Sequence, residues 1–314
     1  MRKLKHLLEY LGLLLLVQIA AAVPRRTLLA FGAGLGRFTF SILRIRRRVA
    51  LENLQHAFPE MPRAELQAIA RNNYENFGRM MMEYFRLPKL SAQELDQLVR
   101  FRDSGHEQLW QQALAEGRGA ICMTGHFGNW EYLGAMVARR FPMVFLYQAQ
   151  NNPYADQLIR RTRQQMHMAS IPRGSAMKGI LKALREKKFV AILADQDAGQ
   201  SGIFVGFLGR PASTARGPAA FVLRSGAPIL FVVAIRQADG THVIESDCLR
   251  FDDLAATLSD EEKIREITTR WSKVLEDYIR RYPDHWFWMH RRWKTQPHSL
   301  ETQPSTARAV SPEA

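Results

Sequence analysis

The chain has 314 residues, 46% of them hydrophobic and 24% charged, which is typical of a globular protein and excludes a disordered or repetitive chain. Its length allows one large domain or two small ones. Basic residues exceed acidic residues by 14, so we expect an anionic partner: nucleic acid, an anionic membrane surface, a phosphorylated lipid or an acidic carrier protein. The sequence has no zinc-finger spacing and no RRM-like aromatic motif, which argues against nucleic acid.

The first segment in chain order is an apolar run from residue 7 to residue 23, with basic residues on both sides. Its length is close to the roughly 20 residues of a membrane-spanning helix. A cleaved signal peptide is the alternative, because small residues at 20–22 follow the apolar core. We favour a membrane anchor, since the apolar pattern continues past that position. Positive charge on both flanks leaves the orientation open.

A second, semi-apolar stretch covers residues 27–45 and leads into a basic run at residues 44–48. Such a stretch is typical of a helix that lies in the membrane interface, and the basic run is suited to contact anionic head groups. We therefore predict a membrane anchor and interfacial segment over residues 1–48.

The pattern beyond residue 48 predicts an α/β domain over residues 49–295. Residues 63–87 lack proline and place apolar residues at helical spacing, so we expect a long helix there. From about residue 98, short apolar strands alternate with helices, which predicts a mixed, largely parallel sheet flanked by helices, with sites at the carboxyl ends of its strands. We expect strands at Ala120–Thr124, Met143–Tyr147, Phe189–Ala194, Pro228–Ile235 and His242–Cys248, and helices at Glu107–Glu116, Trp130–Arg140, Pro153–Met168, Ala176–Lys187, Ala215–Arg224 and Asp260–Tyr282. The polar residues 296–314 predict a disordered tail.

The two cysteines, Cys122 and Cys248, lie in apolar, strand-like runs. Buried free thiols are the simplest interpretation of both. Two cysteines are too few for a disulfide framework or a zinc cluster, so we expect a reducing compartment and no metal.

The segment Ile121–Glu131, I-C-M-T-G-H-F-G-N-W-E, carries the candidate chemistry. A buried strand leads through Gly125 to His126, and a helix follows. Within one helix, residues five apart would point about 140° away from each other. We therefore expect His126 in the turn, with Glu131 reaching back from the first helical turn. Gly125 and Gly128 would allow the tight backbone.

The predicted pair of His126 and Glu131 joins a base to a carboxylate that fixes its tautomer and stabilises the imidazolium. The helix N-terminus favours the ionised form of Glu131. The sequence has no G-x-S-x-G nucleophile elbow, and neither cysteine has an adjacent histidine. Such a pair without its own nucleophile fits a reaction in which the substrate supplies one, for example a hydroxyl that attacks a thioester.

The spacing by itself is weak evidence, because nine histidines are enough for a chance match. His242 and Asp247 have the same spacing but lie in an alternating strand without a turn, so we interpret them as structural. For His126 the alternative is a core or turn histidine. The glycines and the strand–turn–helix setting favour catalysis.

The segment H-F-G-N-W-E resembles the H-x-x-x-x-D/E signature of the glycerolipid acyltransferase superfamily. Other pieces resemble its late acyltransferases of lipid A biosynthesis, of the lauroyl/myristoyl type: Asn151–Asp156, Arg163, Ala176–Leu184, Ala194–Gly199, Phe207–Thr214 and Trp286–Lys294. The resemblance covers about residues 1–297. The family often carries Asp at the second motif position, whereas this chain has Glu131, which is one methylene longer.

The resemblance implies a glycerolipid-acyltransferase-like domain on the cytoplasmic side of the inner membrane. It implies transfer of an acyl chain from acyl-carrier protein to a hydroxyl of a Kdo-bearing lipid A precursor, with no metal or organic cofactor. His126 would be the base and Glu131 its partner. Arg163 and Asp195 match positions that the family uses at its site.

Further charged residues are candidates for binding the substrate. Arg173 and Lys178 flank a Gly-Ser turn that could receive phosphate. Asp195 and Asp197 follow an apolar strand, and two acids without further ligands are weak evidence for a metal. Arg210 lies on a Gly/Pro-rich loop. Capping turns, carboxylates that organise nearby arginines and exposed basic groups are the structural alternatives.

Two further features allow two interpretations each. Arg163 lies in a helix with Arg160 and Arg161, so a solvated basic face is the alternative to a site. The aromatic and basic run Trp286–Lys294 suits a membrane interface, and a packed C-terminal end is the alternative.

Three other functions stay open. The acceptor could be another glycolipid or a phospholipid, for example a phosphatidylinositol mannoside, with acyl-CoA as the donor. The chain could bind anionic lipid without chemistry, in which case His126 would be dispensable. Water could replace the acceptor, which would make the protein a hydrolase.

Overall fold

The computed structural model describes residues 2–147, 149–172 and 176–297. Arg173 and most of the predicted tail, residues 298–314, lie outside the described residues.

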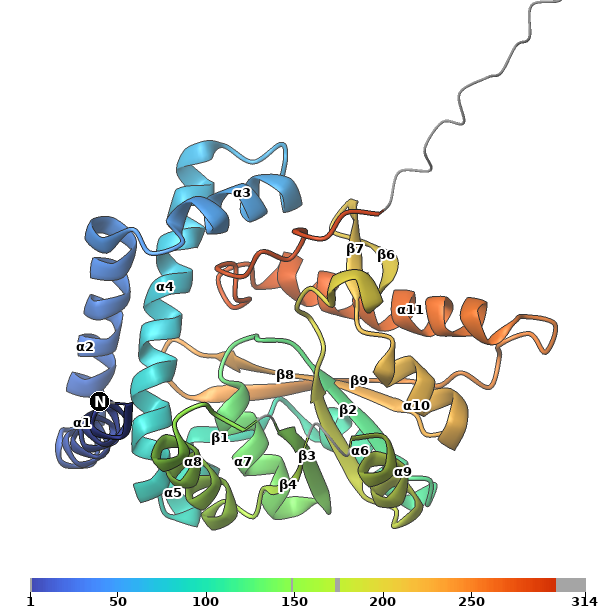
Figure 1. The fold of residues 1–314 in the computed structure, drawn as a ribbon, viewed down its shortest axis with the longest axis horizontal. Coiled ribbons are helices and arrows are strands. Elements are labelled where there is room, and N and C mark those ends of the chain that lie inside the picture. Colours follow the sequence, from blue (N-terminus) through green and yellow to red (C-terminus); the bar gives the residue numbers. More distant parts are fainter. Residues whose placement is uncertain (1, 148, 173–175, 298–314) are drawn as a thin grey trace, which may run out of the picture.

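A seven-stranded mixed sheet forms the centre of the molecule (Figure 1). Its strand order is β1-β9-β8-β2-β5-β3-β4, and neighbouring strands are parallel except for β8 and β9. The strands are β1 (Val99–Phe101), β2 (Ala120–Thr124), β3 (Met143–Tyr147), β4 (Ala169–Pro172), β5 (Phe189–Leu193), β8 (Ile229–Arg236) and β9 (His242–Leu249). A separate antiparallel hairpin consists of β6 (Ile203–Phe207) and β7 (Arg210–Thr214).

Helices cover both faces of the sheet. Successive residues of its central strands point to opposite sides, so both faces carry apolar side chains that the helices bury. Ile121 and Met123 of β2 pack into one core, and Ala120 and Cys122 pack into the other. The first core includes residues of α9 (Ala176–Arg185), α10 (Gly217–Ser225) and α11 (Asp260–Arg281). The second includes residues of α5 (Ala92–Leu98), α6 (Ser104–Ala115) and α7 (Trp130–Arg140). The predicted α/β class is confirmed.

The five predicted strands and the predicted helices are present, and β2, β3 and α7 have the predicted bounds. β1, β4 and the hairpin β6–β7 were not predicted. β4 is an edge strand and mostly exposed, so it lacks the continuous apolar pattern of an inner parallel strand. The helix predicted over 153–168 ends earlier, as α8 (Pro153–Gln165), because His167 adopts a left-handed backbone conformation before β4 begins.

The N-terminal helices stand beside this α/β part (Figure 1). They are α1 (Arg2–Ala22), α2 (Arg25–Phe38), the π-helix η1 (Thr39–Leu43), α3 (Arg47–Ala57) and α4 (Arg63–Arg86). One short 3-10 helix, Leu87–Lys89, directly follows α4, and another, Gly199–Ser201, lies between β5 and β6. α2 packs against α4 at very close range. A Cβ atom at Gly36 would lie 2.1 Å from the carbonyl oxygen of Tyr74, so α2 needs glycine there.

α1 is long and apolar enough to cross a membrane, over Lys3–Ala22, with a mean hydropathy of 1.5. Only 11% of this span is buried inside the protein. Residues 25–43 and 47–57 pass the same test only as a pair, and that pair is bent by 96°. By length and composition, the described part of the chain therefore has one candidate span, or two if the bent pair is one.

Candidate active site

His126 lies where two neighbouring parallel strands end. β2 and β5 pair in register, with Thr124 opposite Leu193. The residues two positions beyond these ends are His126 and Asp195, and they meet at the carboxyl edge of the sheet. This is the edge at which sites gather in parallel sheets.

The turn after β2 depends on glycine. Gly128 has a φ of 57°, and a Cβ atom there would lie 1.8 Å from the carbonyl oxygen of Ala234. A Cβ atom at Gly125 would lie 3.2 Å from Oδ2 of Asp195. Gly128 thus provides the tight backbone that was predicted, and Gly125 allows Asp195 to come close.

Asp195 is the carboxylate that holds His126. Its Oδ1 atom accepts a hydrogen bond from Nδ1 of His126 at 2.8 Å, and its Oδ2 atom accepts one from the backbone N–H of His126 at 2.8 Å. The indole N–H of Trp286 donates a third hydrogen bond to Oδ2, at 2.9 Å. With Nδ1 protonated, the imidazole presents the lone pair of Nε2, as a general base requires.

Burial and charge act on this pair in opposite directions. Burial raises the pKa of Asp195, but His126 and the hydrogen bond from Trp286 more than offset it and lower that pKa to about 2. Burial lowers the pKa of His126, but Asp195 and, less strongly, Glu131 more than offset it and raise that pKa above its usual value. Asp195 therefore stays ionised, and His126 is a stronger base than a free imidazole.

His126 lines a small cavity of about 20 Å³, which we call the histidine cavity. The rings of Trp130 and Phe287 lie 5.2 Å and 6.2 Å from the imidazole, centroid to centroid. Nε2 of Gln196 lies 3.5 Å from Nε2 of His126. The side chains that contact the imidazole nitrogens in the described part of the chain are thus Asp195 and Gln196. Neither carries a hydroxyl or a thiol, which fits a nucleophile supplied by the substrate.

Glu131 is paired with Arg163 and not with His126. Its Oε1 atom accepts a hydrogen bond from Nη2 of Arg163 at 3.2 Å. This corrects the predicted pairing: Asp195, which the neighbouring strand brings, occupies Nδ1 of His126. Oε2 of Glu131 and Nε of Arg163 are buried without a hydrogen-bond partner within the described chain. Oε2 of Glu131 is therefore available as a hydrogen-bond acceptor beside the site, and Nε of Arg163 is available as a donor.

A mostly apolar cavity of about 60 Å³ extends from this ion pair between α7 and the sheet, and we call it the apolar cavity. Glu131 and Arg163 line it together with Trp110, Cys122, Met143 and Met168, among others. Trp130 lines both this cavity and the histidine cavity. An apolar chain that reached the inside of the protein would therefore lie next to the base.

Three other predicted binding residues, Asp197, Arg210 and Lys178, are not brought to His126. The side chain of Asp197 is buried and accepts hydrogen bonds from the backbone N–H and the hydroxyl of Thr295, with Lys294 at 3.5 Å. Arg210 is exposed at the start of β7, and Lys178 is exposed on α9. These three do not line the histidine cavity. Asp197 instead anchors the C-terminal segment.

The tryptophans of the aromatic and basic run Trp286–Lys294 are packed inside the protein, which corrects the membrane-interface interpretation, and Arg291 and Lys294 are exposed. Trp286, Trp288 and Arg292 are at most 2% exposed. Burial lowers the pKa of Arg292 to about 10, and its guanidinium binds the carbonyl oxygen of Ser213. The run therefore packs next to the site, and Trp286 contacts the site directly through its hydrogen bond to Asp195.

The structural interpretation of His242 and Asp247 is confirmed. His242 is fully buried, and its Nε2 atom lies 3.8 Å from Glu83. Asp247 accepts a hydrogen bond from the hydroxyl of Tyr278. Cys122 and Cys248 are free, the first buried and the second half-buried. Among the described residues, no group of His, Cys, Asp and Glu side chains could hold a metal ion.

The fold and the site define an α/β protein in which a histidine, held by a buried carboxylate, lies close to an apolar cavity. The model of the family described as "Bacterial lipid A biosynthesis acyltransferase" matches residues 1–295. The chain belongs to this family and is an acyltransferase, as its resemblance predicted.

Individual relatives agree with this assignment. The chain is 26% identical to the lipid A biosynthesis lauroyltransferase of Escherichia coli (strain K12), over 310 residues that cover 95% of each chain. It is 27% identical to the lipid A biosynthesis palmitoleoyltransferase of the same organism, over 88% of this chain and 87% of that protein. It is also 26% identical to the phosphatidylinositol mannoside acyltransferase of Mycobacterium tuberculosis (strain CDC 1551 / Oshkosh), over 57% of this chain and 58% of that protein.

Proposed function

We propose that this enzyme moves a fatty acyl chain from acyl-carrier protein to a hydroxyl of a Kdo-bearing lipid A precursor. His126 acts as general base, and no covalent enzyme intermediate forms. The observation that carries the mechanism is the hydrogen bond between His126 and Asp195, which leaves the lone pair of Nε2 as the basic site. The family and the two relatives from Escherichia coli support the acceptor.

The reaction needs few groups from the protein. Nε2 of His126 takes the proton of the acceptor hydroxyl while its oxygen attacks the thioester carbonyl carbon. The tetrahedral intermediate then collapses, the carbon–sulfur bond breaks, and the imidazolium returns its proton to the thiolate. Asp195 stabilises the imidazolium throughout, since it stays ionised.

The apolar cavity is where we place the acyl chain of the donor. Its volume in this structure suits only a few methylene groups, so a longer chain has to displace side chains. Met143 and Met168 line it, and their unbranched side chains repack easily. Arg163, which lines the same cavity, can donate from its buried Nε atom to the carbonyl oxygen of the thioester.

Residues 1–48 form the membrane anchor and interfacial segment in this proposal, and residues 49–295 form the catalytic domain on the cytoplasmic face of the inner membrane. On α1, Leu8 and Leu15 are each 61% exposed. On α2, Phe31 is 62% exposed, and Ile42 in η1 is 66% exposed. Large apolar side chains with this exposure are suited to lipid rather than water.

The proposal is tested with an acyl-transfer assay on purified wild type and His126→Ala. The donor is an acyl-carrier-protein thioester, and the acceptor is the Kdo-bearing precursor in detergent micelles. We expect the lipid to gain the mass of one acyl chain with wild type. The rate with His126→Ala should be about 10² to 10⁴ times lower, because the general base is lost.

Circular dichroism of the variant shows whether its fold is intact. Equal rates for the two proteins would disprove the role of His126. A parallel reaction with a phosphatidylinositol mannoside and acyl-CoA tests the second acceptor and donor. Faster transfer there would retain the mechanism and replace the substrates. Release of free fatty acid without any lipid product would identify a hydrolase.

A further inference from the structure

A basic cavity of about 690 Å³ lies between the start of α2, the middle of α4 and the turn from β8 to β9. Its lining includes four arginines and two acidic residues: Arg25, Arg26, Arg79, Arg236, Asp239 and Asp284. We call it the arginine cavity. Four guanidinium groups face this cavity, and their N–H donors are suited to an anion.

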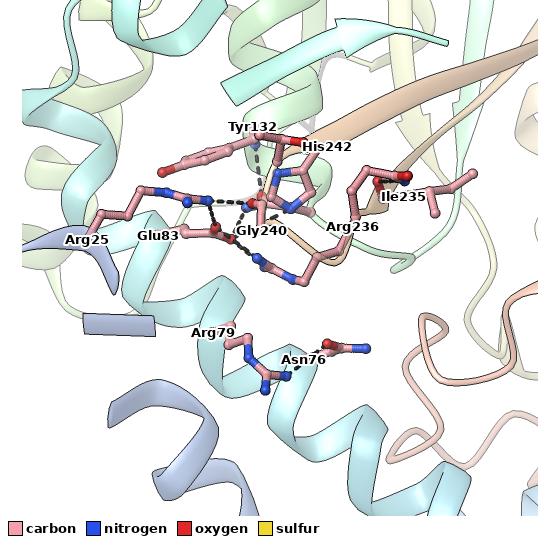
Figure 2. Close-up of polar contacts among 12 residues, drawn as sticks. Arg25, Asn76, Arg79, Glu83, Tyr132, Ile235, Arg236, Gly240 and His242 are labelled. Carbon is pink, nitrogen blue, oxygen red and sulfur yellow. Dashed lines mark hydrogen bonds and ion pairs between the residues drawn. The ribbon is translucent and has the colours of Figure 1, made fainter. Parts of the chain in front are cut away.

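Two of the arginines are held in place by one buried carboxylate (Figure 2). Glu83 is 1% exposed, and its Oε1 atom accepts hydrogen bonds from Arg25 at 3.1 Å and from Arg236 at 3.0 Å. Arg236 makes a second bond to Oε2, and Arg25 also donates to the carbonyl oxygen of Gly240. Burial raises the pKa of Glu83, but the facing basic groups more than offset it and lower it, so the carboxylate stays charged.

Other donor groups of these arginines have a shared partner or none within the described residues. Arg26 is exposed and has no hydrogen bond or ion pair within the described residues. Arg79 reaches Glu75 at 3.3 Å, and Glu75 is shared with Arg37. Nε of Arg25 is buried and has no partner in the described part of the chain. No side chain caps the N-terminus of α2, where both Arg25 and Arg26 lie.

The arginine cavity adjoins the catalytic base. Asn76, Arg236 and His285 line both this cavity and the histidine cavity that contains His126. On its other side, the histidine cavity shares Trp130 with the apolar cavity. The base therefore lies between a site suited to negative charge and a site suited to an acyl chain.

The arginine cavity also adjoins the proposed membrane surface. Arg25 and Arg26 come directly after Pro24, which follows the end of the apolar helix α1. The same helix α2 that carries them also exposes Phe31 and Leu35. A lipid whose head group lies at the membrane surface would meet these arginines when it reaches the base.

We propose that the arginine cavity binds the anionic groups, phosphate or carboxylate, on the sugar head group of the lipid acceptor. Binding there places a hydroxyl of the same lipid at Nε2 of His126. Glu83 acts as a positioning residue, because it fixes Arg25 and Arg236. The inference rests on the proposed function in one respect: the bound lipid is taken to be the acceptor of the acyl chain.

The test is a binding measurement that does not need activity. Full-length His126→Ala protein in neutral micelles is titrated with a phosphorylated disaccharide lipid and with the same lipid after removal of its phosphates. We expect tighter binding of the phosphorylated form, weakening as salt is added. Arg26→Ala combined with Arg79→Ala should reduce that affinity about 10- to 100-fold, the usual size for lost charge-assisted hydrogen bonds. It should leave the dephosphorylated lipid unaffected.

Arg71→Ala is the matched control, because Arg71 is exposed on the same helix α4 and does not line the arginine cavity. It should bind both lipids as His126→Ala alone does, and Arg79→Lys should restore part of the loss. With His126 intact, the double variant should raise KM for the acceptor and leave kcat nearly unchanged.

Equal binding of the phosphorylated lipid by the double variant and the control would overturn the proposal. Weaker binding of acyl-carrier protein, with lipid binding unchanged, would also overturn it and make the cavity a docking site for the donor. If lipid binding responds as expected but wild type transfers no acyl chain, the anion site stands and the proposed function fails.

Discussion

The imidazole of His126 owes its position to a carboxylate from another part of the chain. Asp195 accepts two hydrogen bonds from His126 and one from Trp286. A buried carboxylate with three donors keeps its charge, and that charge favours the tautomer of neutral His126 with the proton on Nδ1 and the lone pair on Nε2. Glu131, the nearer residue in sequence, acts on His126 only through its charge and forms its own pair with Arg163.

Asp195→Asn should lower kcat/KM for acyl transfer by about 10² to 10⁴, because the imidazolium loses its counter-ion and the tautomer is no longer fixed. The pH profile should change as well. In the proposed mechanism neutral His126 is the active form, so wild-type activity should fall as the pH drops below the pKa of His126, which Asp195 raises against the effect of burial. Removing the Asp195 charge lowers that pKa, and the acidic limb of kcat/KM moves to lower pH.

Glu131→Gln is the comparison for this profile. The charge of Glu131 raises the pKa of His126 less than the charge of Asp195 does. The acidic limb of kcat/KM should therefore move less toward low pH in Glu131→Gln than in Asp195→Asn. A larger movement in Glu131→Gln than in Asp195→Asn would contradict the assignment of Asp195 as the partner of the base.

At the scale of elements, the close contact between α2 and α4 positions the arginine cavity. α2 and α4 meet through glycines: a Cβ atom at Gly78 would lie 2.0 Å from the carbonyl oxygen of Gly32, and one at Gly36 would lie 2.1 Å from that of Tyr74. This contact brings Arg25 of α2 within hydrogen-bond distance of Glu83 of α4.

Gly36→Leu should therefore lower the free energy of unfolding by about 1 to 3 kcal/mol, the usual range for overpacking a tight contact. Chemical denaturation in detergent measures it. Gly34→Leu is the matched control, because no atom lies within 4 Å of a Cβ at Gly34 on the same helix. It should be neutral or slightly stabilising, since leucine favours a helix over glycine. Equal destabilisation by both would mean that α2 does not pack on α4 in solution.

At the scale of the whole molecule, the large apolar side chains that are most exposed lie on α1, α2 and η1, the helices that stand beside the α/β part. α1 exposes most of its leucines, whereas Val17 and Ala20 are buried. Asn152, the N-cap of α8, donates to Glu9, so α1 is also tied to the α/β part by a polar contact. If α1 enters a membrane, as we propose, this contact would keep the α/β part close to the membrane surface.

Changing Leu8, Leu11 and Leu15 together to serine should lower partition into anionic vesicles at least about 100-fold, because each exposed leucine contributes about 1.5 to 3 kcal/mol on burial in an apolar medium. Vesicle sedimentation measures the bound fraction. The unfolding temperature of the α/β part should stay within about 2 °C, since the three side chains are at least 50% exposed. Met177→Ser, at an exposed apolar residue on α9, is the control and should bind vesicles like wild type. Unchanged partition of the triple variant would exclude α1 as the anchor.

The sequence by itself determined the features that depend on local pattern. Continuous apolar runs located β2 and β3, helical spacing located α7, and glycines on both sides of His126 marked the turn that carries the base. The motifs around these elements identified the family. These features are local because strand pleat, helical period and left-handed backbone are properties of neighbouring residues.

Only the tertiary structure decided which distant residues meet. The order of strands puts β5 next to β2, and that adjacency selects Asp195 instead of Glu131 as the partner of His126. The packing of the C-terminal segment buries Trp286 and Arg292, although their run looks like an interfacial cluster in sequence. The arginine cavity joins α2, α4 and β8, which are far apart in the chain. Such contacts are set by burial of apolar surface and pairing of buried charge over the whole molecule, and a local pattern does not specify them.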